Sequence, residues 1–241
     1  MSDTTMSLAG KRVVLIGGAS GIGFAVAALS RAQGAEVLIA SRNAANVAAA
    51  VERLSGTKGA TVDLRDEASV SGFSQNLGAF DHLAITAGDW DGRLFRATQD
   101  LDLAAARNGF DVRFWGALAA VKHASRLVAA NGSITLTSGM LTHRPRRATL
   151  LATAIGGAVE SLVRGLAVDL APLRINAVRP GLILTDHVKQ MPPDMQRTYV
   201  AGLPLPRAGS PTEAATAYVY LMLNSYTTGQ ILPVDGGGGL V

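Results

Sequence analysis

The sequence predicts a single α/β domain over residues 1–241, a doubly wound parallel β-sheet with helices on both faces. Short β-branched runs alternate with longer Ala/Leu-rich segments of helical spacing, which is typical of right-handed βαβ crossovers. No Pro/Ser-rich linker, internal repeat or low-complexity segment interrupts the alternation. The chain has 241 residues, 48% of them hydrophobic and 17% charged. This length and composition are sufficient for one large core.

The predicted strands are short apolar runs of the kind that is buried on both faces in parallel sheets. We expect strands over 12–17, 36–40, 82–86, 133–137, 174–178 and 230–234, and a weaker one over 60–64. The segments between them have helical spacing, and we expect helices over 21–33, 43–54, 67–77, 101–130, 150–171 and 212–223. A Pro-rich stretch over 191–207 breaks the pattern. We therefore predict a substrate lid around residues 186–210.

The composition excludes several functional classes. The chain has no Cys, so it has no disulfide scaffold, cysteine nucleophile or thiolate metal site. His82, His123 and His187 show no metal-ligand spacing, and we interpret them as surface or ordinary polar residues. The 18 Arg and 4 Lys are scattered and the net charge is only +4, so we expect no nucleic-acid partner.

The sequence also predicts no membrane segment. No uninterrupted apolar run approaches roughly 18 residues, and the opening MSDTTMSLAGKR lacks the order of a signal peptide. We therefore expect a cytoplasmic location. Asp89-Trp90-Asp91 is interpreted as an acidic surface turn.

A glycine-rich turn follows the first predicted strand and opens the first predicted helix. Its sequence is Gly17-Gly18-Ala19-Ser20-Gly21-Ile22-Gly23. Glycines permit a tight turn and let backbone N–H groups approach a pyrophosphate at the helix N-terminus. An ordinary Gly-rich turn would look similar, but the position between strand and helix favours a dinucleotide site. The predicted cofactor-binding residues here are Gly18, Ser20, Gly21, Ile22 and Gly23.

The end of the second predicted strand indicates which dinucleotide binds. An NAD site usually has an acidic residue here, about 20 residues after the glycines, to bind the ribose 2′-hydroxyl. This chain has Ser41 and Arg42 instead, and an Arg guanidinium suits a 2′-phosphate. The sequence therefore predicts NADP(H), with Arg42 as an ordinary solvated residue the alternative.

Several further segments match motifs of one family. The glycine turn resembles TGxxxGIG, with Gly17 in the Thr position, and Asp63-Leu64 resembles the adenine-contacting Asp after strand three. Ile85-Thr86-Ala87-Gly88 stands where that family has NNAG. RPGLILT, over 179–185, resembles the PG motif with its nicotinamide-binding Thr, and 228–237 resembles the closing strand. On these motifs the chain resembles the short-chain dehydrogenase/reductase family over nearly its whole length.

The resemblance implies a Rossmann-type domain with a cofactor cleft at the carboxyl ends of the strands. It also implies a small-molecule substrate and a homodimer or homotetramer. The further cofactor contacts that it implies are Asp63, Leu64, Ala87, Gly88, Thr137, Pro180, Gly181, Leu182, Ile183 and Thr185.

The catalytic residues of that family match poorly. In the family a Tyr protonates the carbonyl oxygen, a Lys four residues later supports it, and a Ser and an Asn complete the site. No Tyr in this chain has Lys at i+4, and alignment puts Ala152 and Gly156 at those positions. FDVRFWG resembles LDVNLxG with Arg113 replacing the Asn, and strand alignment puts Gly139 at the Ser position, one residue after Ser138. We predict Ser138 and Arg113 as the catalytic residues.

Two functions remain open. The first is an atypical NADP(H)-dependent reductase of a C=O or C=N (iminium) group, in which Arg113 stabilises an oxyanion or fills the space left by the Lys. Iminium ions need no proton on hydride addition, so they tolerate loss of the acid. The second is a non-redox NADP(H)-binding protein: a sensor, a scaffold or an inactive partner subunit. Retention of the 179–185 motif favours the enzyme, because a pure adenine binder would not need it.

Two further side chains are predicted near the substrate. His143 lies in the cluster THRPRR, which would attract an anionic substrate or supply a proton, although a solvated charge run is the plainer interpretation. Tyr199 lies in the predicted lid. It could serve as a substitute acid, although a lid Tyr more often packs or contacts substrate.

Overall fold

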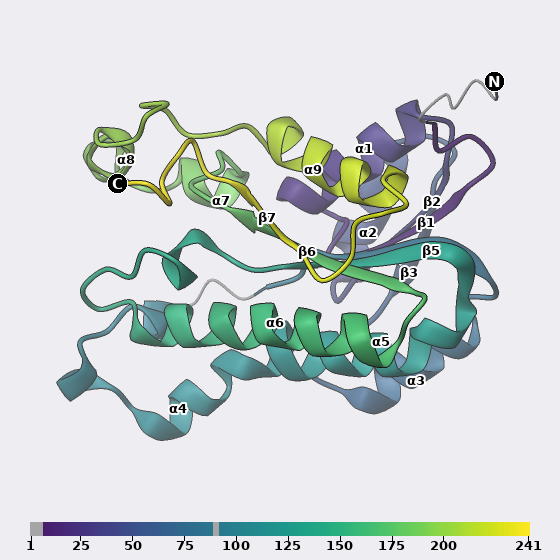
Figure 1. Cartoon of the computed structure of the whole chain (residues 1–241), viewed down its shortest axis with the longest axis horizontal. Helices are drawn as coiled ribbons and strands as arrows, with labels where there is room; N and C mark the ends of the chain where they lie inside the picture. Colours follow the sequence, from purple (N-terminus) through teal and green to yellow (C-terminus); the bar gives the residue numbers. More distant parts are fainter. Residues whose placement is uncertain (1–6, 89–91) are drawn as a thin grey trace.

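The fold is a parallel sheet of seven strands in the order β3-β2-β1-β4-β5-β6-β7 (Figure 1). The computed structural model describes residues 7–88 and 92–241, so the predicted turn at 89–91 lies outside the described residues. The order reverses between β1 and β4, which makes this the topological switch point where α/β sheets bind ligands. The strands are β1 (Arg12–Ile16), β2 (Glu36–Ser41), β3 (Lys58–Thr61), β4 (Phe80–Ile85), β5 (Val128–Thr137), β6 (Arg174–Pro180) and β7 (Ile231–Val234). The predicted fold class is confirmed.

Helices cover both faces of the sheet. On one face α3, α5 and α6 pack against the strands, and on the other lie α1, α2 and α9 (Figure 1). Ser210 begins α9 as a capping box with Glu213, which satisfies two otherwise unpaired backbone N–H groups. The helices are α1 (Gly21–Ala32), α2 (Ala44–Arg53), α3 (Glu67–Gln75), α4 (Leu103–Arg107), α5 (Ala117–Ala124), α6 (Leu150–Asp169), α7 (Asp186–Lys189), α8 (Pro193–Val200) and α9 (Pro211–Leu223).

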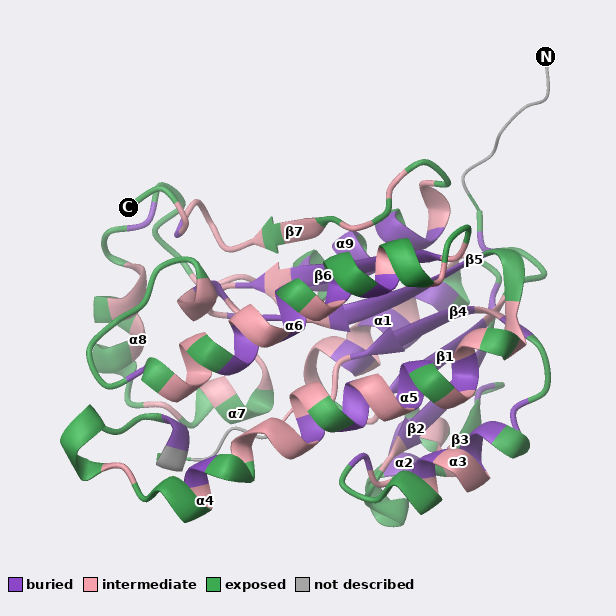
Figure 2. Cartoon of the chain, turned by 60° about the horizontal axis from the view of Figure 1, so that its bottom comes forward, coloured by how far each residue is buried: buried purple, intermediate pink, exposed green. Residues whose placement is uncertain are grey.

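The core consists of two apolar layers separated by the sheet. Side chains alternate between the faces of a strand, so Val14 and Ile16 of β1 join the layer under α3, α5 and α6, whereas Val13 and Leu15 join the layer under α1 and α9. Figure 2 shows the central strands buried between the helices. Burial on both faces makes the sheet a rigid platform for loops at the strand ends.

The predicted helix over 101–130 is wrong as one continuous element. The structure divides it into α4, a π-helical turn over Asp111–Gly116, α5 and a 3₁₀ turn, and β5 already begins at Val128. Gly116 explains one part of the irregularity, because a Cβ there would lie 2.4 Å from the carbonyl oxygen of Leu64. The Ala/Leu-rich composition predicted one regular helix, but the close approach of the Gly116 backbone to Leu64 accompanies a local departure from α-helical geometry. π-Turns of this kind are frequent at functional sites.

The helix α6 is long and apolar enough, by length and composition, to cross a membrane. Its sequence contains no uninterrupted apolar run of that length, because Glu160 and Arg164 divide it. In the fold, α6 packs on β5 and β6 (Figure 1). Val159 and Val163 lie in the core and Glu160 is buried beside them.

Candidate functional site

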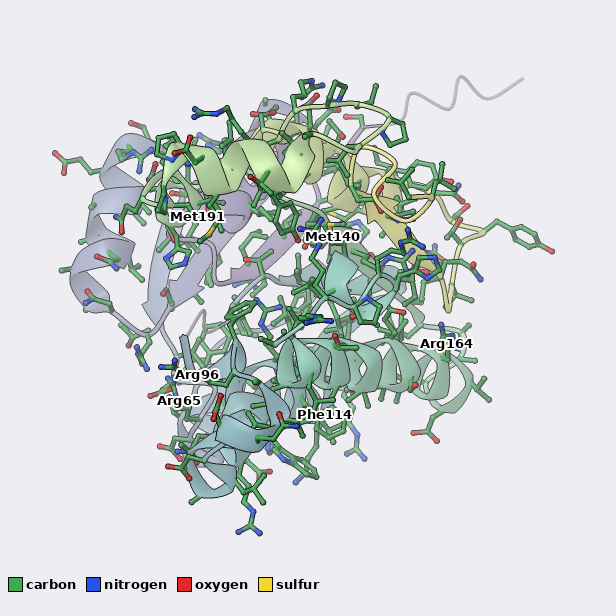
Figure 3. The ribbon with its side chains drawn as sticks, turned by 90° about the vertical axis from the view of Figure 1, so that its left-hand side faces the viewer. Arg65, Arg96, Phe114, Met140, Arg164 and Met191 are labelled. Carbon is green, nitrogen blue, oxygen red and sulfur yellow. The ribbon has the colours of Figure 1, made fainter. Side chains whose placement is uncertain are left out.

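The candidate site lies at the carboxyl edge of the sheet, where the loops after the strands converge. Figure 3 views the molecule from this end. Met140, in the turn after β5, and Met191, after α7, both line a cavity there. Parallel sheets bind ligands at this edge near the switch point. The cofactor and substrate residues predicted from the sequence should therefore lie close to one another here.

The glycine turn forms a cradle that side chains would fill. Gly17 has φ +91°, and a Cβ on it would lie 2.4 Å from the backbone nitrogen of Ala87. A Cβ on Gly23 would lie 2.2 Å from the carbonyl oxygen of Gly17. Ser20 is the N-cap of α1, and its hydroxyl makes no capping hydrogen bond. A bare turn at a helix N-terminus is the arrangement that binds a pyrophosphate, so these residues fit a dinucleotide.

The predicted adenine end lies at the carboxyl ends of β2 and β3. Ser41 ends β2 and the exposed Arg42 follows it. Asp63 follows β3; its carboxylate accepts a hydrogen bond from the backbone N–H of Arg65 at 3.0 Å and lies 3.9 Å from the Arg65 guanidinium. Leu64 is buried. The structure therefore brings Arg42 and Asp63 to neighbouring strand ends, with Asp63 partly neutralised by Arg65.

The ends of β4 and β5 are held by hydroxyl groups. Thr86 donates to the carbonyl oxygen of Gly17 at 3.1 Å, which ties β4 to the glycine turn. Thr137 donates to the carbonyl oxygen of Ile85 at 2.7 Å and accepts from the hydroxyl of Tyr218 at 2.6 Å. Burial raises the pKa of Tyr218, despite its contact with Thr137. The hydrogen of the Thr137 hydroxyl is thus used within the protein, so this side chain could only accept a hydrogen bond from a cofactor.

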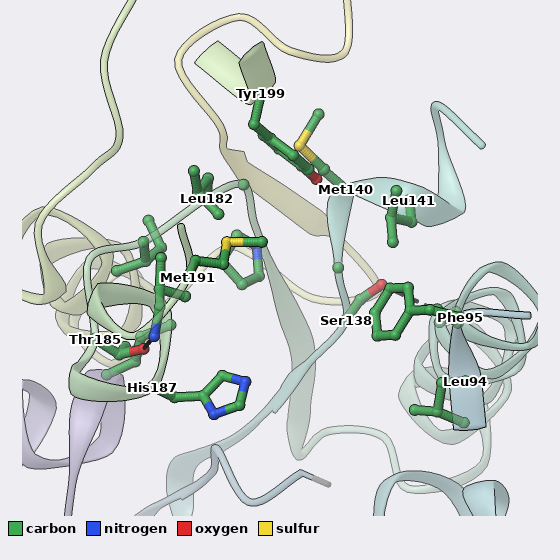
Figure 4. A pocket seen from close by; sticks show the side chains of 18 of the residues that line it. Leu94, Phe95, Ser138, Met140, Leu141, Leu182, Thr185, His187, Met191 and Tyr199 are labelled. Atoms are coloured by element: carbon green, nitrogen blue, oxygen red, sulfur yellow. Dashed lines mark hydrogen bonds between the residues drawn. The ribbon is translucent and has the colours of Figure 1, made fainter. Parts of the chain in front are cut away.

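A cavity of about 560 Å³ opens beside these strand ends (Figure 4). Its wall is mostly apolar, and the predicted lid supplies one side of it from α7, α8 and the turn between them. Such cavities bind small molecules by burying apolar surface, with a few polar groups fixing orientation. The lining residues are Ile22, Gly92, Leu94, Phe95, Arg113, Ser138, Gly139, Met140, Leu141, Ala152, Ile155, Gly156, Pro180, Gly181, Leu182, Ile183, Thr185, His187, Val188, Met191, Met195 and Tyr199.

The segment after β6 forms the cavity wall nearest the glycine turn. Gly181 donates its backbone N–H to the carbonyl oxygen of Val234 at 2.9 Å, which holds the segment against β7. Thr185 caps α7, and its hydroxyl accepts from the backbone N–H of Val188. A Cβ on Gly21 would lie 3.1 Å from Cγ2 of Thr185. The residues predicted for the pyrophosphate and for the nicotinamide are therefore adjacent.

Ser138 reaches the cavity wall but is only 1% exposed. Its hydroxyl donates to Oε1 of Glu160 at 2.9 Å. Arg179 lies 3.6 Å from the same carboxylate oxygen, and its buried Nε has no hydrogen-bond partner. Because a serine hydroxyl has one hydrogen, this contact leaves Ser138 without a proton to offer toward the cavity.

The strand alignment of Gly139 with the family's Ser is consistent with the geometry. Gly139 lines the cavity, and a Cβ on it would meet nothing within 4 Å. Ala152 and Gly156, at the positions of the family's Tyr and Lys, also line the cavity. A Cβ on Gly156 would lie 2.0 Å from Oγ1 of Thr142. Thr142 therefore occupies the space beside Gly156, a role that the sequence suggested for Arg113.

The guanidinium of Arg113 lies against Gly88 instead. A Cβ on Gly88 would be 2.5 Å from both Nε and Nη2 of Arg113. Arg113 also lines the cavity, so it brings a fixed positive charge to the end of β4. A larger residue at position 88 would therefore displace this guanidinium.

The two predicted substrate residues differ in their placement. Tyr199 lines the cavity, and the guanidinium carbon of Arg146 lies 4.0 Å from its ring centroid. Burial raises the pKa of Tyr199, and the charge of Arg146 opposes that rise. His143 is not among the cavity-lining residues; it lies near Gly239, where an added Cβ would be 3.2 Å from its Cδ2. The structure therefore places Tyr199 at the cavity and His143 against the C-terminal segment.

Sequence reasoning missed two residues of this region. His187, interpreted from the sequence as a surface or ordinary polar residue, is exposed and also lines the cavity, a role that the sequence did not indicate. Glu160 is 6% exposed and holds Ser138. The only sequence signal for Glu160 was that it is an acidic residue in an otherwise apolar helical segment, one turn after Gly156. Among the described residues, no cluster of three or more His, Asp or Glu side chains is placed to hold a metal ion.

Comparisons with known proteins agree with this geometry. Residues 17–238 match the family profile described as enoyl-(acyl carrier protein) reductase. The chain is 33% identical to the short-chain dehydrogenase/reductase ucsE of Acremonium sp., with 97% of each protein covered. A small-chain dehydrogenase crystallised with NADPH is 36% identical, with a TM-score of 0.83 and coverage of 96% of this chain and 99% of that one.

A third relative is the MalC reductase/Diels-Alderase of Malbranchea aurantiaca. Its structure is 29% identical, with a TM-score of 0.90 and coverage of 99% of this chain and 98% of that one. The likeness to these proteins extends over almost the entire chain, including the glycine turn and the segment after β6. From the fold, the bare glycine cradle and these matches, the chain belongs to the short-chain dehydrogenase/reductase family of oxidoreductases, which bind a nicotinamide cofactor.

Proposed function

We propose that the chain is an NADP(H)-dependent reductase that reduces a C=O or C=N bond, including an iminium ion, of a small molecule without the usual tyrosine acid. The observation that carries this proposal is the position of the cavity. One wall is the 181–185 segment that the family uses for nicotinamide, and the other lining residues include apolar side chains of the predicted lid and of the 92–95 segment. A substrate in this cavity would lie beside the reactive end of the cofactor.

NADP(H) is favoured over NAD(H) by the end of β2. Arg42 is exposed directly after the strand, and Ser41 rather than an acidic residue precedes it. A guanidinium binds a phosphate in a bidentate, charge-assisted manner, whereas an acidic residue would repel the 2′-phosphate. The relative crystallised with NADPH supports the same choice.

The cavity wall supports a bulky apolar substrate. Phe95, Leu141, Met191 and Met195 line it, and Met side chains adapt to irregular ligands. Bound NADPH would supply a hydride there. Arg113, at the end of β4, would orient the substrate and stabilise negative charge that develops on its oxygen. The relative MalC bears the name reductase/Diels-Alderase, which combines reduction and a cyclisation in one protein of this fold.

The second candidate is a protein that binds NADP(H) without turning it over. The observation in its favour is that Thr142 fills the space next to Gly156, so a side chain at the position of the family's Lys would require Thr142 to move. We also propose that the chain forms a homodimer or homotetramer, as members of the family commonly do. The exposed apolar side chains of Trp115 and Val168 are available on the surface for such contacts.

The experiment combines binding and turnover. NADPH is titrated by fluorescence, and NADPH oxidation is then followed with carbonyls, enones, imines and iminium ions. Tight NADPH binding, together with NADPH oxidation by any of these compound classes, supports the reductase. The compound class that is reduced shows whether the reaction needs a proton donor. Tight binding with no oxidation across the panel would favour the non-redox protein. A chain that does not bind NADPH would contradict both candidates.

A further inference from the structure

We propose that His187 donates the proton to the substrate oxygen when this cavity reduces a carbonyl, an inference that rests on the reductase activity proposed above. His187 is the second residue of α7, directly after the segment that forms the nicotinamide wall. Figure 4 shows its imidazole ring projecting from α7 into the cavity, across from Leu94 and Phe95. Imidazole is the side chain that exchanges a proton most readily near neutral pH.

The helix holds His187 in place. Thr185 caps α7 through the backbone N–H of Val188, and the carbonyl oxygen of His187 accepts the backbone N–H of Gln190 at 3.2 Å. These contacts fix the backbone of the residue that carries the imidazole, while the ring remains on the cavity side. Precise placement of a proton donor relative to the reacting atom is what general acid catalysis requires.

The other polar side chains of the wall are poorly suited to this step. Ser138 already donates its hydrogen to Glu160. The hydroxyl of Thr185 accepts a hydrogen bond as the cap of α7 and keeps its hydrogen, but an aliphatic hydroxyl is far too weak an acid for general acid catalysis near neutral pH. Burial raises the pKa of Tyr199, whose ring is also covered by Arg146. Arg113 remains protonated at any pH of interest, so it stabilises an anion without giving up a proton. Among the described lining residues this leaves the His187 imidazole.

The proton balance is simple. The carbonyl carbon accepts a hydride from the C4 position of the nicotinamide of NADPH, and the π-electron pair moves to the oxygen. The imidazolium N–H bond of His187 breaks as the O–H bond of the alcohol forms. Neutral imidazole then takes a proton from solvent, to which the exposed His187 has access. A quaternary iminium substrate accepts the hydride and needs no proton.

The charged and titratable groups around His187 are consistent with this role. Asp186 and Lys189 flank it on α7 and pair with each other at 3.0 Å. From the other elements of the wall, Arg113 and Tyr199 share the cavity with it. The positive charge of Arg113 would stabilise the negative charge that develops on the substrate oxygen until the proton arrives.

The test compares two bicyclic compounds of nearly the same shape, 2-tetralone and the N-methyl-3,4-dihydroisoquinolinium ion. In His187→Gln, we expect ketone reduction to fall about 10²–10⁴-fold, the usual contribution of a general acid, while iminium reduction and NADPH affinity stay at the wild-type value. His123→Gln is the matched control, because His123 lies on α5 and contacts Glu67.

A second measurement needs neither cofactor nor turnover. The chain has only 4 His, so the imidazole C2–H resonance of His187 can be assigned by its absence in His187→Gln. We expect addition of 2-tetralone to the protein without cofactor to shift this resonance and to leave that of His123 unchanged. No shift would overturn the placement of His187 beside the substrate.

The outcomes separate this inference from the activity on which it rests. Equal loss of both reductions in His187→Gln would show a positioning role and overturn the proton-donor role, as would undiminished ketone reduction. A wild-type protein that reduces neither compound, yet shows the His187 shift, would contradict the proposed reductase activity and not the location of the imidazole.

Discussion

Gly23→Ala tests the cofactor cradle most directly. A Cβ at position 23 would lie 2.2 Å from the carbonyl oxygen of Gly17 and 2.4 Å from Oγ1 of Thr86. The optimal separation of non-bonded heavy atoms is about 3.5 Å, so the first turn of α1 and the glycine turn must separate by about 1 Å. Thr86 can rotate, but the Gly17 carbonyl belongs to the backbone and moves only with the turn.

Two effects on the free energy of unfolding oppose each other in Gly23→Ala. Overpacking of this kind lowers it by about 1–3 kcal/mol, and the better helix propensity of Ala raises it by up to about 1 kcal/mol. We therefore expect the free energy of unfolding to fall by about 1–2 kcal/mol. A turn displaced by that amount would lose at least one charge-assisted hydrogen bond to a phosphate, worth about 1.5–3 kcal/mol. NADPH affinity should therefore fall at least about tenfold.

The assay is a fluorescence titration of NADPH together with urea unfolding. Gly72→Ala is the control, because Gly72 also lies inside a helix, α3, and an added Cβ there meets nothing within 4 Å. We expect that variant to bind NADPH normally and to gain up to about 1 kcal/mol of stability. If Gly23→Ala bound NADPH as tightly as the wild type, the glycine turn would not be the pyrophosphate site.

Three other predictions concern the cofactor, the chemistry and the acid stability. Arg42→Asp should weaken NADPH much more than NADH in a fluorescence titration, because it replaces the proposed phosphate partner by a like charge; an unchanged preference would refute that role. Arg113→Ala should abolish turnover and leave NADPH affinity nearly intact, and retained steady-state turnover would remove Arg113 from the chemistry. Burial, and next the charge of Arg174, lower the pKa of His82 to about 4. As the pH falls, the imidazole of His82 is therefore protonated near pH 6.5 in the unfolded chain but only near pH 4 in the folded chain. Stability should therefore fall by roughly 3 kcal/mol over that range, and His82→Asn should reduce the fall in urea denaturation; equal pH dependence in both proteins would show that His82 does not contribute.

Local patterns were sufficient to predict the sheet. The central strands β1, β2, β4 and β6 are mostly buried apolar runs, whereas the edge strand β3 (KGAT) is largely exposed and begins two residues before the predicted range. The Gly17–Gly23 turn has a spacing that its close contacts with Ala87 and Thr86 explain. The cofactor residues follow strand ends, so predicting the strands also predicted where these residues meet. The substrate side of the cavity was harder to predict from the sequence. Its walls come from the 92–95 segment, the turn after β5 and the 186–210 segment, which are distant in sequence.

Individual side chains were the least predictable part of the site. A motif places Ser138 one residue from the family's Ser, but its direction depends on the buried carboxylate of Glu160, 22 residues further along the chain. His187 showed no spacing signal, because a single histidine on a four-residue helix has no periodicity. Its position on the cavity wall arises only when α7 folds back over the strand ends.

The contact between Thr142 and Gly156 has a consequence for engineering. Introducing serine at position 139 would meet open space, whereas introducing lysine at position 156 would collide with Thr142. A conventional Tyr-x-x-x-Lys pair therefore involves a third position. The hydroxyl of Thr142 must rotate away from a side chain at position 156, and its Cβ would still lie 3.3 Å from the new Cβ. Thr142→Ala removes the closest of these contacts, so it is the substitution to combine with the lysine.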